Sequence, residues 1–175
     1  MTVPALIVLV LLRMPLIAAS ADLLATGAEL PPLEATTLNG EAAALPHDAL
    51  GHPAILVIGF SKASSKATRP WLEGCRAYGS GCYDIRMVEG VPRTFRGMME
   101  RGMRSGLPVE LQRRTLLVYS DNDAWRGRVG MADDKTAYVI GCDKEGRVRA
   151  TATGNFIEAE LERVLASIEG VKLPS

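Results

Sequence analysis

Histidine and cysteine are scarce in this chain, which has only two histidines and three cysteines among its 175 residues. His47 and His52 lie in a connection that contains proline and glycine, and no cysteine or cluster of carboxylates accompanies them. Transition metals in proteins are held by gathered His, Cys and carboxylate side chains. The sequence therefore predicts no metal site, and we expect both histidines at the surface or at the entry to a strand.

Net charge is also missing, because 20 acidic side chains balance 20 basic ones. A nucleic-acid partner would require a basic face, so the sequence predicts none. No motif indicates a cofactor. The hydrophobic fraction of 47% is too high for a disordered chain, and no repeat or second linker interrupts it, so we expect one globular domain.

The first 21 residues are typical of a signal peptide. Residues 4–12 form an apolar run and Ala19-Ser-Ala21 fits a small-x-small cleavage site, although no Lys or Arg precedes the run. We expect an exported protein, either periplasmic or membrane-anchored and facing the periplasm. An uncleaved anchor and a wrong start site are the alternatives to cleavage. The predicted organisation is a signal peptide at 1–21, a flexible lead-in at 22–28, a domain at 29–170 and a tail at 171–175.

An unbroken apolar run at residues 54–60 predicts a buried central strand. Serines follow it, so we expect the strand to turn directly into a helix at about 62–79, which Pro70 ends or kinks near its middle. Asn39-Gly40 predicts a hairpin between segments 30–38 and 41–45. Further strands are predicted at 83–88, 115–120, 136–141 and 147–152, and helices at 93–105 and 157–168.

The helix predicted at 93–105 has one apolar face, made by Phe95, Met98, Met99 and Met103. Three methionines on one face are compatible with a soft-metal site, but no Cys or His joins them. We therefore expect flexible core packing. Arginines are frequent between residues 93 and 128, and carboxylates largely offset them. A solvated surface of mixed charge is favoured there over a patch for an acidic partner or anionic lipid.

The order of the elements and three short stretches resemble thioredoxin-like proteins. Gly51-His-Pro-Ala-Ile-Leu-Val-Ile-Gly-Phe60 looks like the central strand of TlpA-type exported thiol–disulfide proteins and peroxiredoxins. Pro70-Trp-Leu72 is similar to their kinked first helix, and Tyr138-Val-Ile-Gly-Cys-Asp-Lys-Glu-Gly-Arg-Val148 looks like their final hairpin. The resemblance covers roughly residues 27–170. It implies an α/β fold, namely a thioredoxin-like three-layer α/β/α architecture with a central mixed sheet and an N-terminal β-hairpin extension.

The chain departs from this family where the family's chemistry lies. The family's working site is Cys-x-x-Cys at the start of the first helix, where the helix dipole stabilises a thiolate. Here Lys62-Ala-Ser-Ser65 or Ser65-Lys-Ala-Thr68 stands in that place, and no proline between Pro108 and Pro174 supplies the family's cis-proline. A hydroxyl cannot form the disulfide of the redox cycle. We therefore expect no catalytic residue, and a vacant redox site at Ser61, Lys62, Ser64, Ser65 and Thr68.

The hydroxyl side chains at these positions are interpreted as helix caps. A serine nucleophile is disfavoured, because no histidine lies nearby in the sequence and no Gly-x-Ser-x-Gly motif is present. Anion binding at the helix start is a weaker alternative.

Cys75 and Cys82 are separated by a segment with two glycines, which lets the chain turn back and bring them within disulfide range. In an oxidising compartment we expect a structural disulfide between them. The alternative is a redox-active pair, and with it the function of a thiol–disulfide oxidoreductase. Cys142 lies on a predicted strand and is expected to be a buried small hydrophobe.

Redox-silent thioredoxin-like domains include the ATP-synthase assembly factors of mitochondria and their bacterial relatives. Residues 54–154 resemble them in a helix start without cysteine, a tryptophan in the first helix (Trp71) and a long basic middle. The resemblance implies a domain that acts in protein interaction or assembly rather than as an enzyme. Its partner would be a protein, which could be membrane-associated.

Overall fold

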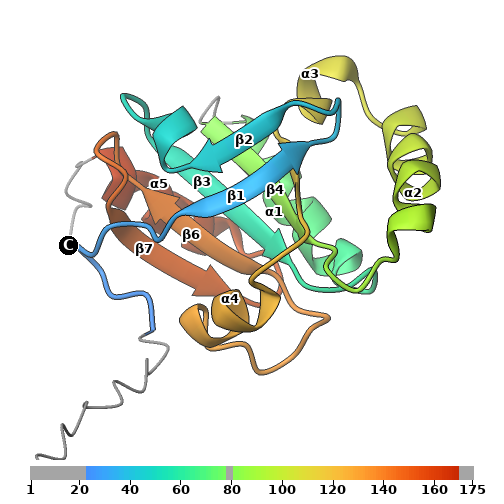
Figure 1. The fold of residues 1–175 in the computed structure, drawn as a ribbon. Helices are drawn as coiled ribbons and strands as arrows, with labels where there is room; N and C mark the ends of the chain where they lie inside the picture. The colour runs from blue at the N-terminus through green and yellow to red at the C-terminus, as the bar shows by residue number, and fades with distance from the viewer. Residues whose placement is uncertain (1–22, 78–80, 170–175) are drawn as a thin grey trace, which may run out of the picture.

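The computed structural model describes residues 23–77 and 81–169 (Figure 1). The predicted signal peptide lies outside this part of the chain. Seven strands form one mixed sheet in the order β2-β1-β5-β4-β3-β6-β7. Within the described ranges, none of the helices has the length and apolar character needed to cross a membrane.

The sheet is built around β3 (Ala54–Gly59), in which every residue is buried. It pairs in parallel with β4 (Gly81–Met87) on one side and antiparallel with β6 (Tyr138–Cys142) on the other. Beyond β4 lies β5 (Thr115–Val118), which is also parallel. Beyond β6 lies β7 (Val148–Thr153), its antiparallel hairpin partner. A strand buried on both faces reads as a continuous apolar run, which is why the sequence locates β3 so clearly.

An N-terminal hairpin extends the sheet beyond β5. Its strands are β1 (Leu33–Thr37) and β2 (Ala42–Leu45), and β1 pairs antiparallel with β5. The turn at Asn39-Gly40 is where the sequence predicts it, and Gly40 has a φ of +95°, a conformation that glycine adopts readily.

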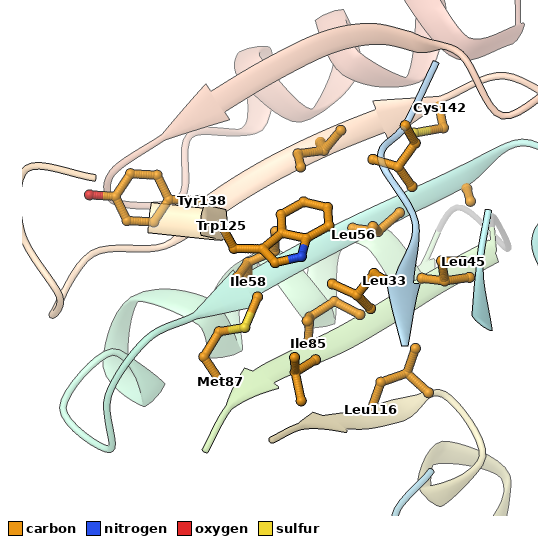
Figure 2. Packing of buried hydrophobic residues seen from close by; sticks show 14 of the residues in the cluster. Leu33, Leu45, Leu56, Ile58, Ile85, Met87, Leu116, Trp125, Tyr138 and Cys142 are labelled. Atoms are coloured by element: carbon orange, nitrogen blue, oxygen red, sulfur yellow. The ribbon is translucent and has the colours of Figure 1, made fainter. Parts of the chain in front are cut away.

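Helices cover both faces of the sheet, so the predicted α/β class is confirmed. Ile55 and Val57 of β3 face α1 (Ser65–Ala77) and α5 (Glu158–Glu169), and with them form one apolar cluster. Leu56 and Ile58 face the opposite way, toward Trp125 of α4 (Asn122–Arg128) and the hairpin residues Leu33 and Leu45 (Figure 2).

Close packing joins α1 to the segment before α5. The rings of Trp71 and Phe156 meet edge to face, with centroids 5.4 Å apart. Gly74 makes this approach possible, because a Cβ there would lie 2.8 Å from the Phe156 ring and 3.0 Å from Leu161. Pro70 lies inside α1, as predicted, but the helix begins at Ser65 rather than at about residue 62.

The middle of the chain holds the largest departure from the sequence prediction. Helix α2 (Arg93–Ser105) has the predicted bounds, but none of its residues is buried. The sequence did not predict the short helices η1 (His47–Ala49) and α3 (Val109–Gln112). In Figure 1, α2 stands at one side of the molecule, away from the hairpin β6–β7.

Candidate binding groove at the start of helix α1

The turn from β3 into α1 is fixed by serine side chains. The Ser61 hydroxyl donates to the carbonyl of Asp134 at 2.9 Å and accepts from the Ser64 N–H at 3.3 Å. The Ser64 hydroxyl donates back to the Ser61 carbonyl at 2.7 Å. Ser64 also packs directly against Gly59, so closely that a Cβ at Gly59 would overlap its hydroxyl. The hydroxyls predicted to cap the helix instead form a turn that precedes it and anchor this turn to the loop before β6. Among the described hydrogen bonds, none joins these hydroxyls to a backbone N–H of α1.

The positions predicted as a vacant redox site come together at this turn. Ser61, Lys62, Ser65 and Thr68 line one groove, while Ser64 is buried beneath it. No cysteine lies among them. Cys75 is ten residues beyond Ser65, which places it about 15 Å along the helix axis.

The groove has a volume of about 790 Å³ and lies between the start of α1, the ends of β3 and β4, and helices α2 and α4. This size is within the range of small-molecule and cofactor sites. Its apolar walls include Phe60, Val91, Met99 and Met103. Hydroxyl and cationic side chains stand at the α1 end, so the groove combines an apolar wall with a polar end.

A partly buried ion pair forms part of the same surface. Asp84 of β4 is 3% exposed, and its Oδ2 accepts from Nε and Nη2 of Arg86 at 2.9 and 2.8 Å. Both side chains line the groove and also a second hollow of about 450 Å³, which runs along α1 past Arg69 and Arg76. The two hollows share five lining residues, so they adjoin one another.

Helix α2 forms the outer wall of the groove, and its apolar face is not part of the core. Phe95 is 55% exposed and Met98 is 61% exposed, while Met99 and Met103 line the groove. The prediction that these four side chains fill the core is therefore wrong. Apolar periodicity identifies a face that avoids water, but it does not say whether the same chain covers that face.

Tyr119 contacts two side chains of α2 and holds the helix in place. The Arg96 guanidinium lies 4.0 Å from the Tyr119 ring centroid, and the Tyr119 hydroxyl donates to Glu100 at 2.7 Å. Burial raises the pKa of Tyr119 to about 12, and the hydrogen bond to Glu100 adds to this shift. The helix is thus attached by polar and cation–π contacts rather than by buried apolar area.

Helix α4 closes the groove with two polar atoms that have no partner. Asn122 is 8% exposed, and its backbone N–H donates to Glu89 at 3.0 Å. Its side-chain Oδ1 and the Nε of Arg126 are both enclosed and form no hydrogen bond. Leaving a buried polar group unpaired costs about 1–3 kcal/mol, so a polar partner for either atom would be favourable.

The cysteines lie away from this groove. Cys75, near the end of α1, and Cys82, on β4, are 0% and 3% exposed. Both are free thiols, and the neighbouring Cys82 thiol, together with burial, raises the pKa of Cys75. Cys142 is buried at the end of β6, as predicted, and burial raises the pKa of its thiol to about 12. The expected juxtaposition of Cys75 and Cys82 is present, and their oxidation remains a prediction.

Comparison with known proteins rests on structure alone. No protein-family model matches the chain, and neither does any curated protein sequence. The thiol peroxidase from Chromobacterium violaceum superposes with a TM-score of 0.58 at 16% identity, covering 86% of this chain and 90% of its own.

The chain has a thioredoxin-like fold. A thio-disulfide isomerase from Thermus thermophilus gives a TM-score of 0.55 at 16% identity, with coverage of 81% and 94%. BsSco, a member of the Sco family of cytochrome c oxidase assembly proteins, gives 0.58 at 11% identity, with coverage of 85% and 96%. At these identities the likeness establishes the architecture of the thioredoxin-like domain and not its chemistry.

Sequence reasoning missed Asp84, Arg86 and Asn122 in the groove lining, and it noted Arg126 only as part of the arginine-rich stretch between residues 93 and 128. A signal for the first two is visible in the sequence, because a carboxylate and an arginine alternate with Ile85 and Met87 in an otherwise apolar strand. Asn122 and Arg126 carry no such signal, since they become relevant only when α4 packs beside the start of α1.

Proposed function

We propose that this protein is a redox-inactive thioredoxin-like domain that is exported and acts by binding a protein partner, in interaction or assembly. The observation that carries the proposal is the groove at the start of α1. It keeps an open, partly apolar hollow where the resemblance places a Cys-x-x-Cys, and it is lined by Ser61, Lys62, Ser65 and Thr68 instead.

The exposed face of α2 supports the same proposal. Phe95 and Met98 add apolar area beside the groove, and contiguous exposed apolar surface marks interaction sites. Methionine suits such a surface because its flexible thioether adapts to a partner's shape. BsSco belongs to a family of assembly proteins by its printed description, which makes an assembly role compatible with this architecture.

The alternative, a thiol–disulfide oxidoreductase using Cys75 and Cys82, is less favourable. A catalytic cysteine needs an exposed sulfur and a lowered thiol pKa. Cys75 is fully buried and its thiol pKa is raised by Cys82 and by burial. A disulfide between these cysteines would be a structural cross-link between α1 and β4.

Two measurements test the proposal. In insulin-reduction and peroxidase assays we expect no turnover, and turnover that disappears in Cys75→Ser would overturn the redox-inactive assignment. The unmodified chain should capture a specific protein from a membrane extract, and the Met98→Glu variant should not capture it. Ile157→Glu is the matched control, because Ile157 is similarly exposed, at 58%, but does not lie on α2.

A further inference from the structure

The lining of the groove is more basic than the chain as a whole. The two adjoining hollows are lined by five cationic side chains and two acidic ones, whereas the whole chain has a net charge of zero. One of the two carboxylates, Asp84, is already paired with Arg86. The other cations are Lys62, Arg69, Arg76 and Arg126, and of these Arg126 also lies 3.7 Å from the exposed carboxylate of Asp123. The α1 N-terminus adds a partial positive charge at the same end.

The positive lining favours a ligand with negative charge. The unpaired atoms on α4 add a second requirement for that ligand, which concerns its hydrogen-bonding groups. Asn122 Oδ1 is an acceptor and Arg126 Nε is a donor, and the two residues are four apart on one helix face. A ligand that satisfies both atoms, once the two side chains turn toward the groove, must present a donor and an acceptor side by side. A residue in an extended backbone does so, because its N–H and C=O point to the same side and can bond to one partner together.

The apolar wall supplies the third requirement. Val91, Met99 and Met103 offer contact to an apolar side chain beside the polar end. Because alternate side chains of an extended segment point to opposite sides, one residue can face this wall while its neighbour faces the cations.

We propose that the groove binds an extended segment of the partner protein in which an Asp or Glu stands next to a large apolar residue. The carboxylate lies toward Lys62 and the α1 N-terminus, the apolar side chain lies against Met99 and Met103, and one backbone residue pairs with Asn122 and Arg126. This inference rests on the proposed function, since it names the chemistry of the partner that the domain binds.

The test begins with random nine-residue peptides displayed on phage and selected on the full chain. Enriched peptides are synthesised, each with a copy in which Asp and Glu become Asn and Gln, and affinities are measured by calorimetry. We expect acidic–apolar peptides to be enriched. The neutral copies should bind at least about tenfold more weakly, and the affinity should fall as salt is raised.

Asn122→Leu separates binding from folding. Leucine has a similar size but no polar atom, so the free energy of unfolding should stay the same or rise, while peptide affinity should fall about 3- to 10-fold. Asn155→Leu, outside the groove, is the matched control and should leave the affinity unchanged. Equal binding of the neutral copies, unaltered affinity in Asn122→Leu, or selection of basic peptides would overturn the proposal.

A lipid occupant is distinguished by vesicles of phosphatidylserine and phosphatidylcholine. If the chain binds these vesicles but no peptide, and Asn122→Leu abolishes the vesicle binding, the occupant of the groove is an anionic headgroup and not a peptide. The proposed function fails on a different result, because redox turnover would overturn it. If the protein shows no turnover and captures a partner through Met98, but binds no acidic peptide, only this inference is overturned.

Discussion

The indole N–H of Trp71 donates a hydrogen bond at 3.1 Å to the carbonyl of Gly154, which lies 83 residues further along the chain. This contact connects the middle of α1 to the end of the final hairpin, and the Phe156 ring packs against the same indole. The orientation of α1, and with it the position of the groove at its start, therefore depends on residues far away in sequence.

Trp71→Phe should lower the free energy of unfolding by about 2 kcal/mol, because it removes the hydrogen bond and leaves part of the indole volume empty. Urea unfolding followed by circular dichroism measures the change. Phe156→Leu, which keeps the indole hydrogen bond but loses the edge-to-face contact, should cost about 0.5–1.5 kcal/mol through that contact. A cost below about 0.5 kcal/mol for Trp71→Phe would mean that the Gly154 bond contributes nothing.

Gly59→Ala should destabilise the domain by about 1–3 kcal/mol, because the new Cβ overlaps the Ser64 side chain in a packed turn. Ser64→Ala in the same chain removes the overlapping hydroxyl and should recover part of the loss. A double-mutant cycle in urea measures the coupling between the two positions. Additive costs would show that the two side chains do not conflict.

Refolding in the presence of glutathione disulfide, when Cys75 and Cys82 are accessible, should form one intramolecular bond, with two protons and two electrons passing to the oxidant. Closing a loop of about eight residues stabilises the fold by about 2.5 kcal/mol in the chain-entropy model. The measurement is the difference in unfolding free energy between oxidised and reduced protein. Cys142→Ala should keep this difference and Cys82→Ser should abolish it. Mass mapping that links Cys142 to either residue would contradict the assignment.

Tyr119 should ionise near pH 12, above the ordinary value of 10, because burial and the bond to Glu100 favour the neutral phenol. Since its pKa is raised in the folded state, the stability that Tyr119 contributes is fully present below pH 10 and is lost as the pH rises toward 12. Ultraviolet difference titration against Tyr119→Phe isolates this group. Glu100→Gln should lower its pKa toward 10, and an unchanged pKa would leave burial as the whole cause.

The sequence predicts those parts of the fold that depend on local pattern. The apolar run of β3, the Asn39-Gly40 turn and the bounds of α2 follow from periodicity and turn chemistry, and a thioredoxin-like arrangement follows from their order. The start of α1 is later than predicted, because Ser61 and Ser64 hold a turn before the helix begins.

The groove itself is not predictable in this way. Its wall combines Arg86, Met103 and Arg126, which come from three elements and approach one another only through the strand order β5-β4-β3 and the packing of α4. The exposure of Phe95 likewise depends on the tertiary packing around α2, which a periodic sequence pattern does not describe.

Helix α2 has no buried residue, so its unfolding exposes little apolar surface that is not already in water. We therefore expect the α2 amides to exchange through local opening and the β3 amides only through global unfolding. One wall of the groove can therefore open and close while the sheet stays intact. A partner that binds there would slow the exchange of the α2 amides far more than that of the β3 amides.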